Sequence, residues 1–148
     1  MAGTDAAQIG IIAGEASGDL LGAHMMRALH AQHPDLTACG IAGPRMVEAG
    51  VQALYPSDKL AVNGYGDVLR RLPELLWIRS RTTRHFLKQR PRVFVGIDAP
   101  DFNFTLEEKL KRVGIPTVHF VSPSLWAWRG ERIHRIKRAV SKMLVVFP

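Results

Sequence analysis

Two aspartates three positions apart, Asp98 and Asp101, are the residues of this chain best placed to do chemistry. They lie in the stretch GIDAPDFN, directly after the apolar run RVFVGI. A carboxylate at the end of a buried strand is partly desolvated, which raises its pKa and suits it to act as a general base toward a hydroxyl group. Asp101 and Asn103 also fit the role of helix cap, because a helical stretch follows them. Asp98 lies too far upstream to cap that helix, so we expect it to be catalytic or to bind a ligand.

A glycine-containing loop, AGEASGD, follows the first apolar run of the chain and opens a helical stretch. Amides near Gly14 and Gly18 can approach an anion at a helix N-terminus. The spacing is not G-x-G-x-x-G and no acidic residue closes the second predicted strand, which argues against a dinucleotide site. The glycines also fit a tight turn in which Ser17 or Asp19 caps the helix, and the two interpretations are compatible.

A third loop, SPSLWAWRG, contains Trp126, Trp128 and Arg129. Aromatic rings stack on sugars or nucleobases or pack against lipid chains, and arginine pairs with phosphate. Alternatively, the tryptophans wedge the loop against neighbouring helices. His119, inside a predicted strand, is expected to be a satisfied core histidine, because no second ligand lies at zinc spacing.

One long segment, YGDVLRRLPELLWIRSRTTRHFLKQR, combines an apolar stripe with arginines. The apolar residues at helical spacing are Val68, Leu69, Leu72, Leu75, Leu76 and Trp77. The stripe faces either the core or the interface of a membrane, with arginines on lipid phosphates, and the clustering of arginine favours the membrane. Asp67 is predicted to cap the first turn, and Pro73 to interrupt or restart the helix.

The elements that position these residues follow from the hydrophobic pattern. Apolar runs predict strands over Gln8–Ala13, Leu36–Ile41, Val51–Tyr55, Arg92–Ile97, Thr117–Val121 and Met143–Phe147. Helical spacing predicts helices over Asp19–Gln32, Pro44–Ala49, Asp67–Lys88, Asn103–Val113 and Gly130–Ala139. Continuous apolar runs indicate strands covered on both faces, so the alternation predicts an α/β fold with a Rossmann-like, doubly wound parallel sheet. Ligands bind such sheets at the carboxyl ends of the strands, which selects the three loops described above.

Composition narrows the class of protein. The 148 residues carry a formal net charge of +7, and residues 61–148 hold seventeen Lys or Arg against seven Asp or Glu. This basic excess fits an anionic lipid surface, a phosphorylated substrate, a nucleic acid or a solvated face; no nucleic-acid-binding motif accompanies it, so we expect no nucleic acid. The single Cys39 fits a reducing, cytoplasmic setting, and the N-terminal stretch fits neither a signal peptide nor a membrane span.

Five stretches of the sequence resemble the lipid A disaccharide synthases, inverting glycosyltransferases of bacterial outer-membrane lipid synthesis. They are AGEASGDLLGA, GIAGPRM, LAVNGYGDVL, RPRVFVGIDAPDFN and IPTVHFVSPSLWAWRGERIHRIKR. The resemblance implies the N-terminal half of a GT-B enzyme, in which two Rossmann-like domains enclose the active site. It implies transfer of 2,3-diacylglucosamine from its UDP-activated form to 2,3-diacylglucosamine 1-phosphate, which gives a β-1,6-linked disaccharide and UDP.

The resemblance also assigns roles to individual residues. The family's essential aspartate falls on Asp98, which would accept the proton of the acceptor hydroxyl. Residues expected to contact substrate are Gly14, Glu15, Ser17, Gly18, Asn103, Ser122, Trp126 and Arg129. Neither a metal nor a cofactor is expected, and acylated substrates imply a peripheral location on the cytoplasmic face of the inner membrane.

The chain departs from the family in length. Residues 1–148 correspond to one acceptor-side domain, and the chain stops directly after a predicted strand. UDP is expected to be bound by a missing C-terminal domain or by a complementary chain. This chain alone should therefore not complete the transfer. The alternative function is a non-catalytic membrane-binding module that uses the basic amphipathic face.

Overall fold

Six parallel strands form one sheet in the computed structural model, which describes residues 8–61, 64–120, 134 and 137–144. The strand order is β3-β2-β1-β4-β5-β6. The strands are β1 (Ile9–Ala13), β2 (Ala38–Ala42), β3 (Val51–Pro56), β4 (Val93–Ile97), β5 (Thr117–Phe120) and β6 (Lys142–Leu144). The helices are α1 (Ala16–Gln32), α2 (Pro44–Glu48), α3 (Tyr65–Gln89) and α4 (Pro100–Arg112), with a 3-10 turn, η2, over Ser57–Leu60.

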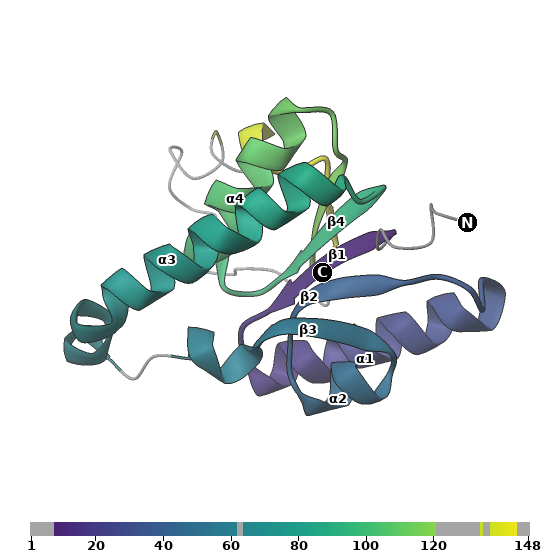
Figure 1. Ribbon diagram of the computed structural model, residues 1–148, viewed down its shortest axis with the longest axis horizontal. Coiled ribbons are helices and arrows are strands. Elements are labelled where there is room, and N and C mark those ends of the chain that lie inside the picture. Colours follow the sequence, from purple (N-terminus) through teal and green to yellow (C-terminus); the bar gives the residue numbers. More distant parts are fainter. Residues whose placement is uncertain (1–7, 62–63, 121–133, 135–136, 145–148) are drawn as a thin grey trace.

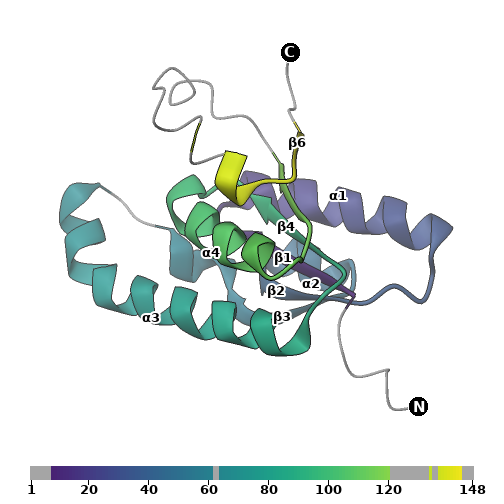
Figure 2. The same ribbon diagram turned by 90° about the horizontal axis from the view of Figure 1, so that it is seen from above.

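Helices cover both faces of the sheet, as the continuous apolar runs predict. Helices α1 and α2 lie on one face and α3 and α4 on the other (Figures 1 and 2). Every residue of β1 and β2 is buried. One core cluster joins Ile11 of β1 to Met26 of α1, and the other joins Ile12 of β1 to Phe86 of α3. The predicted doubly wound α/β fold is therefore confirmed.

The order of the strands reverses beside β1, and this reversal creates the candidate site. The chain proceeds from β1 outward through β2 and β3, then returns through α3 to place β4 on the other side of β1. Ala13 and Ile97, the last residues of β1 and β4, are register partners. The loops that follow them start side by side and lead to helices on opposite faces, which is the usual position of a ligand crevice in an open α/β sheet.

Two helices differ from the sequence prediction. Helix α4 begins at Pro100, not at Asn103, because proline suits the first helical position. Its N-cap is Ala99 and no side chain caps it, so the capping role expected for Asp101 or Asn103 is wrong. Helix α3 runs unbroken through Pro73, so the predicted interruption of the helix is wrong; Pro73 has no N–H to donate to the carbonyl of the exposed Leu69.

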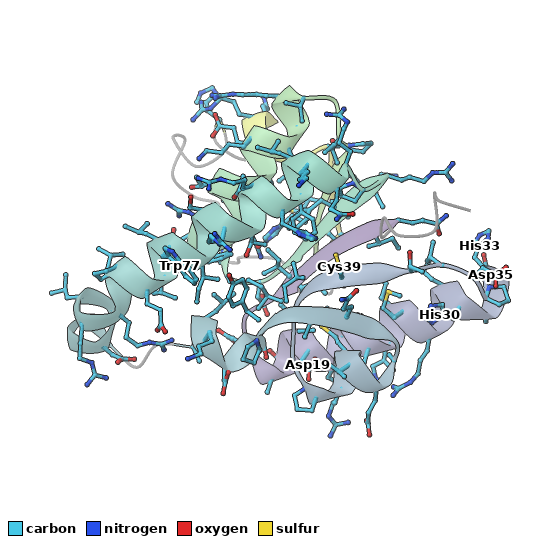
Figure 3. The ribbon with its side chains drawn as sticks, in the orientation of Figure 1. Asp19, His30, His33, Asp35, Cys39 and Trp77 are labelled. Atoms are coloured by element: carbon cyan, nitrogen blue, oxygen red, sulfur yellow. The ribbon has the colours of Figure 1, made fainter. Side chains whose placement is uncertain are left out.

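Asp19 caps a helix other than its own. The N-cap of α1 is Glu15, with no side-chain cap, so neither Ser17 nor Asp19 caps that helix as predicted. Instead the buried Asp19 carboxylate accepts hydrogen bonds from the amides of Gly43, Arg45 and Met46, each at 3.0 Å. Figure 3 shows Asp19 between α1 and α2. This carboxylate satisfies the first amides of α2 and joins the two helices.

Candidate active site

Asp98 sits in a tight turn between β4 and α4. Asp98 and Ala99 both adopt left-handed backbone conformations, with φ of 54° and 43°. Aspartate tolerates this region better than most residues, but each such residue costs about 1–3 kcal/mol and persists only where its surroundings impose it. A residue before proline usually adopts an extended backbone, but Ala99, which precedes Pro100, is left-handed.

Three contacts impose this turn. The amide of Asp98 donates to the carbonyl of Phe120 at 3.3 Å, and the carbonyl of Asp98 accepts from Nδ2 of Asn103 at 2.9 Å. From the other side, a Cβ added to Gly14 would lie only 2.9 Å from the Cβ of Ala99. The loop after β1 therefore packs tightly against the Asp98 turn, and a larger residue at position 14 would push the two loops apart.

The surroundings of Asp98 raise its pKa. Burial contributes most, the negative charge of Glu15 adds to it, and His119 opposes it. The carboxylate lies over the start of α1, since a Cβ added to Gly18 would be 3.7 Å from Asp98 Oδ2. A half-buried carboxylate with a raised pKa accepts a proton from a hydroxyl more readily than an ordinary aspartate does.

A cavity of about 520 Å³ adjoins this turn. One wall is apolar and comes from α3, with Val68, Leu72, Leu75 and Leu76. The opposite wall consists of the residues that follow the two strand ends, namely Gly14, Glu15 and the run 99–102, and Leu60, Ala61 and Arg79 complete the lining. The volume is in the range of small-molecule sites, and charged groups at one side of an apolar wall suit an amphiphilic ligand.

The predicted substrate-contacting residues are distributed unevenly around this cavity. Gly14 and Glu15 line it, whereas Ser17 is exposed on the first turn of α1 and does not. Gly18 is buried beneath the Asp98 carboxylate. Asn103 is fully buried and reaches the backbone of Asp98 instead of the cavity. Ser122, Trp126 and Arg129 lie outside the described residues.

The apolar stripe of α3 is not a buried core stripe. Leu69 is 70% exposed, Trp77 55%, Leu76 44% and Leu72 40%, while Val68 and Leu75 are half-buried. The first turns of α3 extend beyond the sheet, on the side where β1 and β4 end (Figure 1). The helix is anchored to the core by its C-terminal half, where Ile78 and Phe86 are buried. No helix within the described ranges is long and apolar enough to cross a membrane.

Two residues of the site were not predicted from the sequence. Arg79 and Phe102 line the cavity but were not singled out as site residues. Helical spacing carries a signal for Arg79, which continues the series of Val68, Leu72 and Leu75 one turn further. Phe102 follows Asp101 in the first turn of α4 and has no such signal. His119 is buried and pairs with Glu107, which confirms the expected satisfied core histidine.

A solved structure shares the fold of this chain. MurG of Acinetobacter baumannii superposes with a TM-score of 0.59 over 96% of this chain and 42% of the MurG chain, at 15% sequence identity. At that identity the likeness concerns the fold alone. The chain has the Rossmann-like fold of the N-terminal half of a GT-B glycosyltransferase.

Sequence comparison identifies the family. The chain belongs to the lipid-A-disaccharide synthetase family, whose profile matches residues 9–148. It is 78% identical over 138 residues to the lipid-A-disaccharide synthase of Thiobacillus denitrificans, and 62% identical over 140 residues to that of Methylobacillus flagellatus. These matches cover 93% and 95% of this chain but 37% of each relative. The chain thus spans little more than a third of the length of these relatives.

Proposed function

We propose that this chain forms the acceptor-side domain of a lipid A disaccharide synthase. The reaction transfers 2,3-diacylglucosamine from its UDP-activated form to the 6-hydroxyl of 2,3-diacylglucosamine 1-phosphate and releases UDP. Family membership supports the reaction. The observation that carries the proposal is a carboxylate of raised pKa at the end of β4, beside a cavity with an apolar wall.

In this mechanism Asp98 is the general base. Its carboxylate accepts the proton of the acceptor hydroxyl while that oxygen attacks the anomeric carbon of the donor. Attack occurs on the face opposite UDP, so the configuration inverts and a β-linkage forms. The base acts only when it is ionised, and a raised pKa makes it a stronger acceptor of the proton.

The cavity suits the acyl chains of such a substrate. Leu72, Leu75 and Leu76 offer an apolar wall, and Phe102 faces the same space from α4. Burial of each methylene in such a site is favourable by about 0.8 kcal/mol. The charged groups that share the cavity, Glu15, Arg79 and Asp101, then lie on the side of the sugar head group.

The exposed part of α3 supports a peripheral location on the cytoplasmic face of the inner membrane. Leu69 and Trp77 are more than half exposed, and the guanidinium of Arg81 lies 5.4 Å from the centre of the Trp77 ring. Apolar side chains ringed by arginines match a helix at the interface of an anionic membrane. The same face is what a non-catalytic membrane-binding module would use, which is the second candidate function.

The UDP-binding part of the enzyme is assigned to sequence beyond these 148 residues, since the relatives are almost three times as long as the matched region. A UDP-binding second domain or a complementary chain would close the cleft over the strand ends. Residues 1–148 alone are therefore proposed to be inactive.

The experiment supplies the complete protein with the two diacylated sugars and follows the disaccharide and UDP by mass spectrometry. Production of both by the complete protein, with none from residues 1–148 alone, is the expected result. A complete protein that binds anionic vesicles but forms no disaccharide would contradict the enzyme proposal and favour the membrane-binding module.

A further inference from the structure

A cluster of polar side chains lies buried behind the Asp98 turn. Asn103 and Glu107 are each 0% exposed and His119 is 1% exposed. Asn103 and Glu107 lie one turn apart on α4, so their side chains project from the same side of the helix. His119 comes from β5, where its register partner in β4 is Gly96.

Gly96 provides the space for this cluster. A Cβ added to Gly96 would lie 2.1 Å from Oε1 of Glu107 and 3.1 Å from Cγ of Asn103. The carboxyl group and the carboxamide therefore converge on the same point above the strand. A side chain of any other residue at position 96 would collide with the Glu107 carboxyl group.

Two hydrogen bonds are present at the ends of the cluster, and two atoms in its middle lack partners. His119 Nδ1 lies 2.9 Å from Glu107 Oε1, and Asn103 Nδ2 donates to the carbonyl of Asp98 at 2.9 Å. Asn103 Oδ1 and Glu107 Oε2 are the buried side-chain atoms left without a hydrogen bond in the described part of the chain. If Glu107 were ionised, both would be acceptors and neither could satisfy the other.

We propose that His119, Glu107 and Asn103 form a hydrogen-bond relay that positions Asp98, in which Glu107 is protonated and donates from Oε2 to Oδ1 of Asn103. His119 donates from Nδ1 to Oε1 of Glu107, and Asn103 donates from Nδ2 to the Asp98 carbonyl. One proton on Glu107 thus satisfies both orphaned atoms. Every link then donates in the same direction, an arrangement in which successive hydrogen bonds strengthen one another.

Charges around Glu107 are consistent with a neutral carboxyl group. Burial raises the pKa of Glu107, and the hydrogen bond and charge of His119 oppose that rise without cancelling it. Strand β4, which packs against α4, has no charged side chain among its residues Val93–Ile97.

The relay matters because the Asp98 turn is strained. Of the three contacts that hold these two left-handed residues, the hydrogen bond from Asn103 Nδ2 to the Asp98 carbonyl is the one made by a side-chain amide. Small displacements of a catalytic group reduce turnover while substrate binding is retained. This inference rests on the proposed function, since Asp98 is the base only in that reaction. The three relay residues act through Asp98 as positioning residues.

The test compares variants of the complete protein by kcat, KM and melting temperature. Glu107→Gln keeps the shape, donates from its amide to Asn103 and accepts from His119, so most of the turnover is retained. Glu107→Leu removes both links, and Asn103→Asp removes the N–H that grips Asp98. For these two variants we expect kcat to fall by about 10- to 100-fold, with KM changed by less than about threefold.

Glu108→Gln, a surface carboxylate on the same helix that pairs with Arg112, is the matched control. If Glu107→Gln is as damaging to kcat and melting temperature as Glu107→Leu, the negative charge is required and the relay is wrong. An Asn103→Asp variant with undiminished kcat also overturns it, even where Glu107→Leu fails to fold. If the complete protein makes no disaccharide, the proposed function fails, while the melting temperatures of the two Glu107 variants still decide the relay.

Discussion

Asp98 combines an uncommon backbone conformation with an electrostatic environment that favours its protonated form. The left-handed turn directs the chain from β4 into α4, and burial with the nearby charge of Glu15 raises the pKa of the carboxyl group. As the pH falls, a base with a raised pKa becomes protonated, and therefore inactive, at a higher pH than an ordinary aspartate does. The acid limb of the pH–rate profile should therefore lie above the usual aspartate range.

Replacement of Glu15 tests this electrostatic link. The negative charge of Glu15 disfavours ionisation of Asp98, so Glu15→Gln lowers the pKa of Asp98 and moves the acid limb of kcat/KM to lower pH. Glu15→Asp keeps the charge and serves as the control for any loss of substrate contact. The pH–rate profile of the complete protein provides the measurement. A limb that stays in place or moves to higher pH in Glu15→Gln would contradict the link.

At the residue scale, the sequence predicted that Asp98 follows a buried strand, because the hydrophobic pattern shows where that strand ends. This position made Asp98 the candidate base. The partners of Asp98 could not be read in the same way. Asn103 fits a helix cap on composition, yet α4 begins three residues earlier and turns Asn103 back toward Asp98. The Glu107–His119 pair depends on the register of β5 against β4, which only the folded sheet defines.

Helix α3 serves two purposes along its length. Its C-terminal half packs Phe86 against Phe94 of β4, whereas its N-terminal half extends past the sheet and offers apolar side chains to the cavity and the surroundings. Arg71 ties this extension down, since its guanidinium donates to the carbonyls of Lys59 and Ala61. One of the arginines predicted for lipid phosphates is thus engaged within the protein.

Substitutions on α3 distinguish the proposed membrane face from a core face. Leu69, Leu72 and Leu76 are exposed, so serine at these positions should change the free energy of unfolding by less than about 0.5 kcal/mol each while weakening sedimentation with phosphatidylglycerol vesicles. Leu75 is left unchanged because it packs partly against the core. Leu87→Ser, near the other end of the same helix, is the control. Undiminished vesicle binding by the triple variant would exclude the proposed membrane face.

At the element scale, the sequence predicted strands better than helix starts. The strand β1 was placed within one residue, because a continuous apolar run marks a strand buried on both faces. Helices α1 and α4 both begin three residues before the predicted start. The prediction placed caps at Ser17 or Asp19 and at Asp101 or Asn103. Tertiary contacts instead engage Asp19 with the amides of α2 and Asn103 with the Asp98 carbonyl.

Across the whole molecule, the proposed chemistry gathers at one edge of the sheet. The ends of β1 and β4, the cavity and the projecting half of α3 lie together where the strand order reverses. Under the proposed function, a UDP-binding second domain would close over this end of the sheet. The sequence predicted that the loops after β1 and β4 lie at this end of the sheet. The cavity could not be predicted, because it depends on how α3 packs over the strand ends.

The central claim is that Asp98 is the base of the transfer, and an isosteric substitution tests it most directly. Asp98→Asn keeps the size of the side chain, the left-handed turn and the backbone carbonyl, but cannot accept the proton. In the complete protein, disaccharide formation should fall by about 10²- to 10⁴-fold with an unchanged melting temperature, whereas Asp35→Asn on an exposed loop should match wild type. Turnover by Asp98→Asn within about tenfold of wild type would contradict the claim, since general-base catalysis contributes at least about 10²-fold.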